Sequence, residues 1–263
     1  MQNRIDQLFA NKKQGVLNIY CTAGFPELND TVRIMTALQE SGADLIELGM
    51  PFSDPLADGP VIQDSSTKAL KNGMSIHTLF AQLEGFRKTI QVPVVLMGYF
   101  NPVLQFGVEA FCERCAAVGV DGIIVPDLPM WEYEAEYKAI FEKYNVHLIF
   151  LVTPETSDAR MQKIDALSKG FVYAVSSSST TGKDKNMNDQ QAYFRRLQDL
   201  KLKNPVLIGF GIKDKATFDN ACQYSNGAII GTAFIKALEQ GPDLEAAVKG
   251  FVKSIIGQPV PTV

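Results

Sequence analysis

The most informative stretch of this chain joins a short apolar run to an acidic loop. Residues 43–60 read Ala-Asp-Leu-Ile-Glu-Leu-Gly-Met-Pro-Phe-Ser-Asp-Pro-Leu-Ala-Asp-Gly-Pro, which places Glu47 inside the run and Asp54 and Asp58 in the loop. A buried strand rarely holds a carboxylate, because removing the charge from water is costly or shifts the pKa of the group. Glu47 is therefore a candidate catalytic residue on a rigid strand, followed by a stiff loop that carries two more acids.

The run that contains Glu47 is one of eight similar apolar runs along the chain. They are Val16–Thr22, Ala43–Leu48, Pro93–Gly98, Gly122–Pro126, Val146–Val152, Phe171–Val175, Pro205–Gly209 and Gly227–Gly231. Their Val, Ile and Leu content without strict alternation is typical of parallel strands that are covered on both faces. Segments with helical periodicity separate them. Eight β-then-α units in 263 residues predict an α/β protein with a single (β/α)8 TIM-barrel domain over residues 1–263. The alternative is an open doubly wound sheet.

Two helices are expected in addition to the eight units. The first precedes the first strand, and its apolar face of Ile5, Leu8 and Phe9 is suited to closing the bottom of the barrel. The second follows the second strand, because the chain between the second and third strands is unusually long. Ser157, Asp189 and Asp214 each precede a periodic segment and are expected to begin helices.

Composition excludes several functional classes. The chain has 46% hydrophobic and 21% charged residues, a net charge of −4 and a pI near 5.3, so nothing favours nucleic-acid binding. Four cysteines indicate a reducing compartment, and the charged N-terminal stretch is unlike a signal peptide, so we expect a cytoplasmic protein. The pair Cys112-x-x-Cys115 lacks a second pair or a nearby His, so no metal site is predicted.

Period two along the second strand places Leu45 and Glu47 on one face. If Leu45 points into the barrel, Glu47 does so too, near the end where TIM-barrel active sites are built. Asp58 lies in a loop that can fold over the same mouth, and two carboxylates in different environments can divide the acid and base roles. Asp58 also precedes Gly59-Pro60 and a helix, so spacing alone leaves open whether it is catalytic or only a helix N-cap.

Three glycine sites fall at the ends of the last three strands. They are Gly182, Gly209 with Gly211, and Gly231 followed by Thr232. Backbone N–H groups near glycines and helix N-termini bind anions, and the loops after strands seven and eight are the usual phosphate site of a TIM barrel. Together the three sites favour a phosphorylated small substrate.

The chain resembles the alpha subunit family of tryptophan synthase over nearly its whole length. The matching motifs are Glu47-Leu-Gly-Met-Pro-Phe-Ser-Asp-Pro-Leu-Ala-Asp58-Gly-Pro-Val-Ile-Gln63, Gly98-Tyr-Phe-Asn-Pro102, Asp121-Gly-Ile-Ile-Val-Pro-Asp127-Leu-Pro129, Gly209-Phe-Gly-Ile212 and Gly227-Ala-Ile-Ile-Gly-Thr232. The resemblance implies a lyase of tryptophan biosynthesis that cleaves indole-3-glycerol phosphate to indole and glyceraldehyde 3-phosphate by a retro-aldol reaction.

The resemblance also implies roles for individual residues. Glu47 would be the acid and base, Asp58 would hold the indole N–H, and Tyr173 would lie near the glycerol chain. Tyr20 and Phe210 would line the indole pocket, and Gly182, Gly211, Gly231 and Thr232 would bind the phosphate. Thr181 would contact Asp58 in a closed site. These implied catalytic and substrate-binding positions are Glu47, Asp58, Tyr173, Tyr20, Thr181, Gly182, Phe210, Gly211, Gly231 and Thr232.

A partner is implied as well. It is the beta subunit, which carries pyridoxal phosphate and receives indole through a tunnel in an α2β2 complex, whereas this chain would need no cofactor. The surface that faces the partner would include Pro51 and Asp54 in the acidic loop, together with Asn101 and Pro102.

One segment departs from the family pattern. The long loop usually reads Ser-Arg-x-Gly-Val-Thr-Gly, but here residues 176–182 read Ser-Ser-Ser-Ser-Thr-Thr-Gly. Thr181 and Gly182 are kept, the Arg is missing, and Ser179 replaces a Gly. In this family, closure of the loop couples the chain to its partner. The resemblance therefore does not extend to loop closure or to this coupling. We expect the Ser-rich loop to be disordered without a ligand.

Other functions remain as alternatives. A free-standing indole-3-glycerol phosphate lyase would have the same site without the partner. Another sugar-phosphate TIM-barrel lyase or isomerase would share the barrel and the phosphate site. A Schiff-base aldolase is disfavoured, because no predicted strand ends in a Lys.

Overall fold

The structure is a computed structural model that describes residues 2–176, 187–209, 211–240 and 243–257, without the side chains of residues 187–189. Its strands are β1 Val16–Thr22, β2 Leu45–Gly49, β3 Val94–Met97, β4 Gly122–Ile124, β5 His147–Ile149, β6 Leu151–Val152, β7 Val172–Val175, β8 Val206–Gly209 and β9 Gly227–Ile230. All eight predicted strands are therefore present, and only the fifth is divided, at Phe150.

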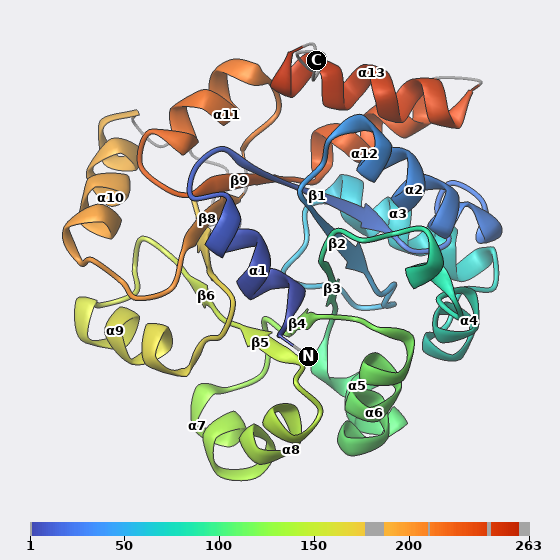
Figure 1. Ribbon diagram of the computed structural model, residues 1–263, viewed down its shortest axis with the longest axis horizontal. Coiled ribbons are helices and arrows are strands. Elements are labelled where there is room, and N and C mark those ends of the chain that lie inside the picture. Colours follow the sequence, from blue (N-terminus) through green and yellow to red (C-terminus); the bar gives the residue numbers. More distant parts are fainter. Residues whose placement is uncertain (1, 177–186, 210, 241–242, 258–263) are drawn as a thin grey trace.

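Helices follow the strands and lie around them (Figure 1). The α-helices are α1 Arg4–Asn11, α2 Thr31–Ser41, α3 Pro60–Lys71, α4 Ile76–Gln82, α5 Phe100–Phe106, α6 Val108–Val118, α7 Met130–Glu132, α8 Lys138–Lys143, α9 Asp158–Leu167, α10 Met187–Asp199, α11 Lys215–Cys222, α12 Thr232–Gln240 and α13 Leu244–Ile256. The shorter turns are η1 Leu28–Asp30, η2 Phe86–Lys88 and η3 Tyr133–Tyr137. None of the helices in the described ranges is long and apolar enough to cross a membrane.

The strands form one parallel barrel. Their order is β5-β4-β3-β2-β1-β9-β8-β7-β6, and every pair is parallel. Because β5 and β6 are separated by Phe150 alone, the two ends of this order meet and the sheet closes. The prediction of a TIM barrel is confirmed, and the open doubly wound sheet is excluded.

Alternate residues of the strands fill the barrel. The interior cluster contains Val16, Leu45, Val95, Ile124, Ile149, Phe171, Tyr173, Val175, Leu207 and Ile229, together with Ile5 and Phe9 of α1. The ring centroids of Phe9 and Phe171 are 6.1 Å apart. Helix α1 thus closes one end of the barrel, as predicted, and it crosses the ring of strands in Figure 1.

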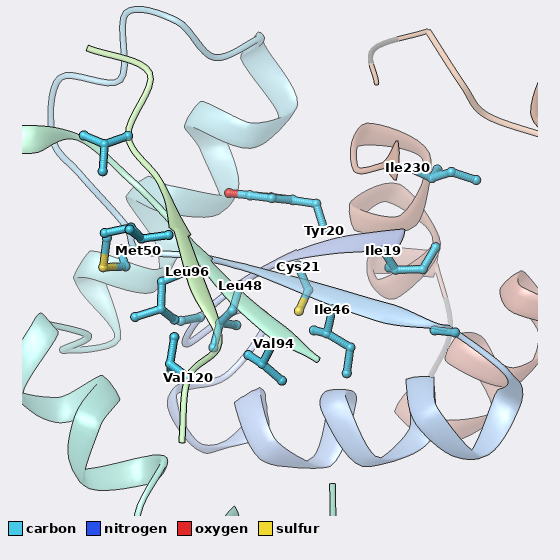
Figure 2. Packing of buried hydrophobic residues seen from close by; sticks show 14 of the residues in the cluster. Ile19, Tyr20, Cys21, Ile46, Leu48, Met50, Val94, Leu96, Val120 and Ile230 are labelled. Atoms are coloured by element: carbon cyan, nitrogen blue, oxygen red, sulfur yellow. The ribbon is translucent and has the colours of Figure 1, made fainter. Parts of the chain in front are cut away.

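The other face of the strands packs against the helices. Ile46, Leu48, Val94 and Leu96 gather on this outer side, and Figure 2 shows Tyr20 and Cys21 on opposite sides of β1. Because Ile46 and Leu48 face outward, Leu45 and Glu47 face the interior. The direction that the sequence predicts for Glu47 on the second strand is therefore correct.

The helix predictions are confirmed in most cases. The long segment between β2 and β3 holds both α3 and α4, so the expected extra helix is present. Ser157 and Asp214 are N-caps whose side chains accept hydrogen bonds from Arg160 N and Thr217 N. Asp189 is not a cap, because α10 already begins at Met187. Helix α5, which precedes α6 after β3, is an additional element that the sequence did not predict.

Candidate functional site

Glu47 is buried in the barrel, with 1% of its surface exposed. In register it lies opposite Tyr20 of β1 and Val95 of β3. Its Oε2 accepts a hydrogen bond from Asn18 Nδ2 at 3.0 Å, and within the described residues it has no ion pair with Lys or Arg. Among the described residues, no basic side chain therefore neutralises this buried carboxyl group.

The environment of Glu47 favours its protonated form. Burial raises the pKa of Glu47 to about 8, the hydrogen bond from Asn18 opposes this rise, and the charge of Asp58 adds to it. A carboxyl group with such a pKa is mostly a carboxylic acid at neutral pH and can donate a proton.

Asp58 is held by a tyrosine that follows β3. Its Oδ2 accepts a hydrogen bond from Tyr99 Oη at 3.0 Å, and Tyr99 Oη accepts one from Ala57 N at 2.9 Å. The Tyr99 ring stacks on Phe52 with centroids 5.2 Å apart. Burial raises the pKa of Asp58, and the bond from Tyr99 opposes the rise.

The interpretation of Asp58 as a helix cap is wrong. Helix α3 has Gly59 at its N-cap position, and no side chain makes the capping hydrogen bond. Asp58 instead lines a cavity that Glu47 also lines. Tyr99 was not predicted as a site residue, although it stands inside the Gly98–Pro102 motif at the end of a strand, which is a usual position for functional residues in this fold.

A cavity of about 130 Å³ lies at the carboxyl ends of the strands. It brings together seven of the predicted site residues, which are Tyr20, Glu47, Asp58, Tyr173, Gly211, Gly231 and Thr232. Gly59, Ile62, Met97, Ile212 and Ile229 complete its lining. The apolar residues among these were not predicted, although Met97 ends β3 and Ile229 lies on the inward face of β9. The cavity joins two carboxyl groups, two phenols and an apolar wall.

The two tyrosines are buried and stay protonated. Burial is the main cause that raises the pKa of Tyr20 and of Tyr173 far above the ordinary value of 10. Each phenol lies over a glycine, because a Cβ on Gly49 would overlap Tyr20 Oη and one on Gly209 would overlap Tyr173 Oη. These glycines make room for the rings.

Part of the cavity lining has the features of an anion site. Gly231 follows β9, and Thr232 begins α12, so the N-terminus of that helix opens into the cavity. Gly211 has a φ of +77°, a conformation that glycine adopts easily. Backbone N–H groups at such a position favour a phosphate. The predicted residues Thr181, Gly182 and Phe210 lie outside the described residues, as does most of the Ser-rich loop.

The predicted partner residues lie on the outer surface. Asp54 and Asn101 are exposed, and Pro51 and Pro102 are half-buried. Two large apolar side chains accompany them, because Leu56 is 87% exposed and Leu104 is 47% exposed.

Comparisons with known proteins identify the family. The family model described as "Tryptophan synthase alpha chain" matches residues 7–255. This chain belongs to the tryptophan synthase alpha chain family.

Relatives in the tryptophan synthase alpha chain family are similar over most of their length. The alpha chain of Flavobacterium johnsoniae is 56% identical over 239 residues, which cover 90% of this chain and 94% of that protein. The alpha chain of Parabacteroides distasonis is 50% identical, with 96% and 99% covered. The solved subunit alpha of Legionella pneumophila has a TM-score of 0.87 at 34% identity, with 97% of each chain covered.

Membership of the tryptophan synthase alpha chain family confirms the function that the resemblance implied, the cleavage of indole-3-glycerol phosphate. Pyridoxal phosphate belongs to the beta subunit in this family. Another similar structure, the tryptophan synthase of M. tuberculosis in its aminoacrylate-bound form, has a TM-score of 0.84 at 32% identity and covers 97% of this chain and 100% of its own. A beta partner is implied for this chain.

Proposed function

We propose that Glu47 and Asp58 carry out the retro-aldol cleavage of indole-3-glycerol phosphate in the cavity at the mouth of the barrel. The observation that carries this proposal is a buried carboxylic acid, with a pKa raised to about 8, that lines the same cavity as a second carboxyl group. Two carboxyl groups in different environments can take different roles.

Glu47 moves the proton in this scheme. As a carboxylic acid, it protonates C3 of the indole ring and becomes a carboxylate. The carboxylate then takes the proton from the glycerol hydroxyl next to the ring, and the carbon–carbon bond breaks as the new carbonyl forms. The bonding electrons return to the ring, which gives indole and glyceraldehyde 3-phosphate. Glu47 ends in the protonated form in which it began.

Asp58 stabilises the ring while it carries positive charge. In its ionised form it accepts a hydrogen bond from the indole N–H, and Tyr99 holds the carboxylate in place. Tyr20 lies against the indole, and Tyr173 lies near the glycerol chain. Phe210 is assigned to the indole pocket and Thr181 to the contact with Asp58 on the family resemblance alone.

The phosphate binds beside the N-terminus of α12. Gly211, Gly231 and Thr232 line the cavity, and Thr232 is the first residue of that helix. Gly182 joins this group on the family resemblance alone. A phosphate fixed there would place the glycerol chain between Tyr173 and Glu47.

Replacing Glu47 with Gln tests the catalytic role. The amide has the same shape but cannot donate and accept the proton, so we expect kcat for indole release to fall by about 10²- to 10⁴-fold. Circular dichroism should show an unchanged fold. Glu84→Gln is the matched control, because Glu84 is exposed and pairs with Arg114 on the outer surface. Near-normal turnover of Glu47→Gln would overturn the proposal.

The same proposal includes an α2β2 complex with the beta subunit, in the cytoplasm. The four cysteines are free, in keeping with a reducing compartment. The docking surface would contain Pro51, Asp54, Asn101 and Pro102, with the exposed Leu56 and Leu104 as apolar contacts. Exposed apolar side chains of this size mark interaction sites when they gather.

Two measurements test the complex. Adding a beta subunit should raise the turnover of this chain, whereas full activity of the isolated chain would favour a free-standing lyase. Leu56→Asp and Leu104→Asp should weaken the association in sedimentation experiments. Ala246→Asp on α13 is the control, because that position is exposed in the first turn of a helix, where an acid is tolerated.

A further inference from the structure

An asparagine inside the barrel touches the carboxyl group of Glu47. Asn18 lies on β1, is fully buried, and is flanked in register by Leu45 and Ile229 of the interior cluster. Its Nδ2 donates to Glu47 Oε2 at 3.0 Å. A buried carboxamide among apolar residues lowers the stability of the fold unless its polar atoms are paired. An asparagine at this position therefore suggests a role in the site.

The other end of the same carboxamide has an unused acceptor. Asn18 Oδ1 is buried and has no hydrogen-bond partner in the described part of the chain. The Nδ2 donor of the amide is therefore bonded to Glu47, whereas its Oδ1 acceptor has no partner among the described residues. Few buried polar atoms in folded proteins lack a partner.

The two ends of the amide match the two states of a carboxyl group. A carboxylate only accepts hydrogen bonds, whereas a carboxylic acid also donates one. A half-turn of the Asn18 carboxamide exchanges Nδ2 for Oδ1, and the two orientations have nearly the same shape. A Lys in place of Asn18 would instead favour the carboxylate, and an apolar residue would favour the acid.

We propose that Asn18 is a positioning residue that holds Glu47 in both protonation states, by donating from Nδ2 to the carboxylate and accepting at Oδ1 from the carboxylic acid. This inference rests on the proposed role of Glu47, which alternates between the two forms in each turnover. Asn18 itself does not line the cavity, so it acts through Glu47 and not on the substrate.

Other ionisable groups interact electrostatically with Glu47, and they must be held constant in a test. They are Asp58 from the acidic loop, Tyr20 and Cys21 of β1, and Tyr173 of β7. A substitution at position 18 leaves all four in place. Any change in the titration of Glu47 can then be assigned to the lost carboxamide.

The test uses Asn18→Leu, which keeps the approximate volume and removes both the donor and the acceptor. The carboxyl stretch of Glu47 is followed by infrared titration, with Glu47→Gln as the reference that lacks this band. We expect the midpoint to move to higher pH by about one unit, a tenfold change in proton concentration, because the lost bond to the charged carboxylate is stronger than the lost bond from the neutral carboxylic acid. We also expect kcat to fall about tenfold with little change in KM.

Matched variants keep the result interpretable. Asn226→Leu makes the same change at a half-buried asparagine that accepts a hydrogen bond from Val206 N, away from the cavity, and should leave the midpoint unchanged. Asn18→Ala removes the same donor and acceptor with a smaller side chain, so it serves if Asn18→Leu does not fold. Its midpoint should move in the same direction.

The outcomes separate the two proposals. An unchanged midpoint in a folded Asn18 variant would overturn the inference about Asn18. A shifted midpoint with an unchanged pH dependence of turnover would support the contact but overturn the catalytic role of Glu47. A shift in both the midpoint and the pH dependence of turnover supports the role of Asn18 and the catalytic role of Glu47.

Discussion

At the scale of single residues, the burial of Glu47 links stability to pH. Its pKa of about 8 in the folded state lies above the ordinary value of 4.5. The stability that the protonated form contributes is therefore present below about pH 4.5 and is lost as the pH rises through about 8. The difference in the free energy of unfolding between the native chain and Glu47→Gln should fall across this window, by up to about 1.4 kcal/mol per pH unit. Denaturant unfolding of both proteins from about pH 4 to about pH 9 measures this difference. If the free energies of unfolding of the two proteins change with pH in parallel, the prediction is contradicted.

Tyr99 gives a second prediction at this scale. Tyr99→Phe removes the hydrogen bond that holds the pKa of Asp58 down, so that pKa should rise further. In the proposed mechanism the ionised form of Asp58 accepts the indole N–H, so the acid limb of kcat/KM should move to higher pH. We expect a loss of about five- to tenfold near pH 6 and a smaller one near pH 8. A loss of equal size at every pH would show that Tyr99 only orders the loop.

At the scale of elements, the strands could be predicted and the contacts between them could not. Apolar runs indicated the eight strands, and period two indicated the inward direction of Glu47, because both signals are local. The partner of Asp58 is Tyr99, 41 residues further along the chain, and that of Glu47 is Asn18, 29 residues earlier. Spacing within one segment contains no information on such pairs, so the sequence could not show that Tyr99 holds the carboxylate of Asp58.

Strand β2 provides a prediction about packing. Gly49→Ala would place a methyl group in the space that Tyr20 Oη occupies, so the ring must move. We expect a loss of stability of about 1–3 kcal/mol and a lower kcat/KM, because Tyr20 lines the cavity. Thermal unfolding and steady-state kinetics measure the two effects.

Helix α13 offers the matched control for this change. Gly250 is exposed in the interior of the helix, and a Cβ there meets no atom within 4 Å. Gly250→Ala should raise the stability by about 0.5–1 kcal/mol and leave kinetics unchanged. If Gly49→Ala behaves in the same way, the close approach of Tyr20 to β2 is wrong.

At the scale of the whole molecule, α1 is part of the barrel core. Phe9 is 5% exposed and packs on Phe171 in the interior. Phe9→Ala should lower the free energy of unfolding by about 3–5 kcal/mol, whereas kcat should change little because the cavity lies at the other end. Chemical denaturation measures the first effect, and Gln7→Ala on the exposed side of the same helix is the control. The prediction that residues 1–263 form one domain stays a prediction.

The position of α1 also determines the route by which small molecules travel. Its side chains fill the interior at the amino ends of the strands, so the cavity of the described residues is reached from the carboxyl ends. The exposed Leu56 belongs to the loop beside that entrance. A protein that docks there stands in the path of everything that enters or leaves. Indole must then leave through the docked protein, or it stays in the cavity until that protein dissociates. Because α1 closes the amino end of the barrel, a protein bound at the carboxyl end would receive the indole directly.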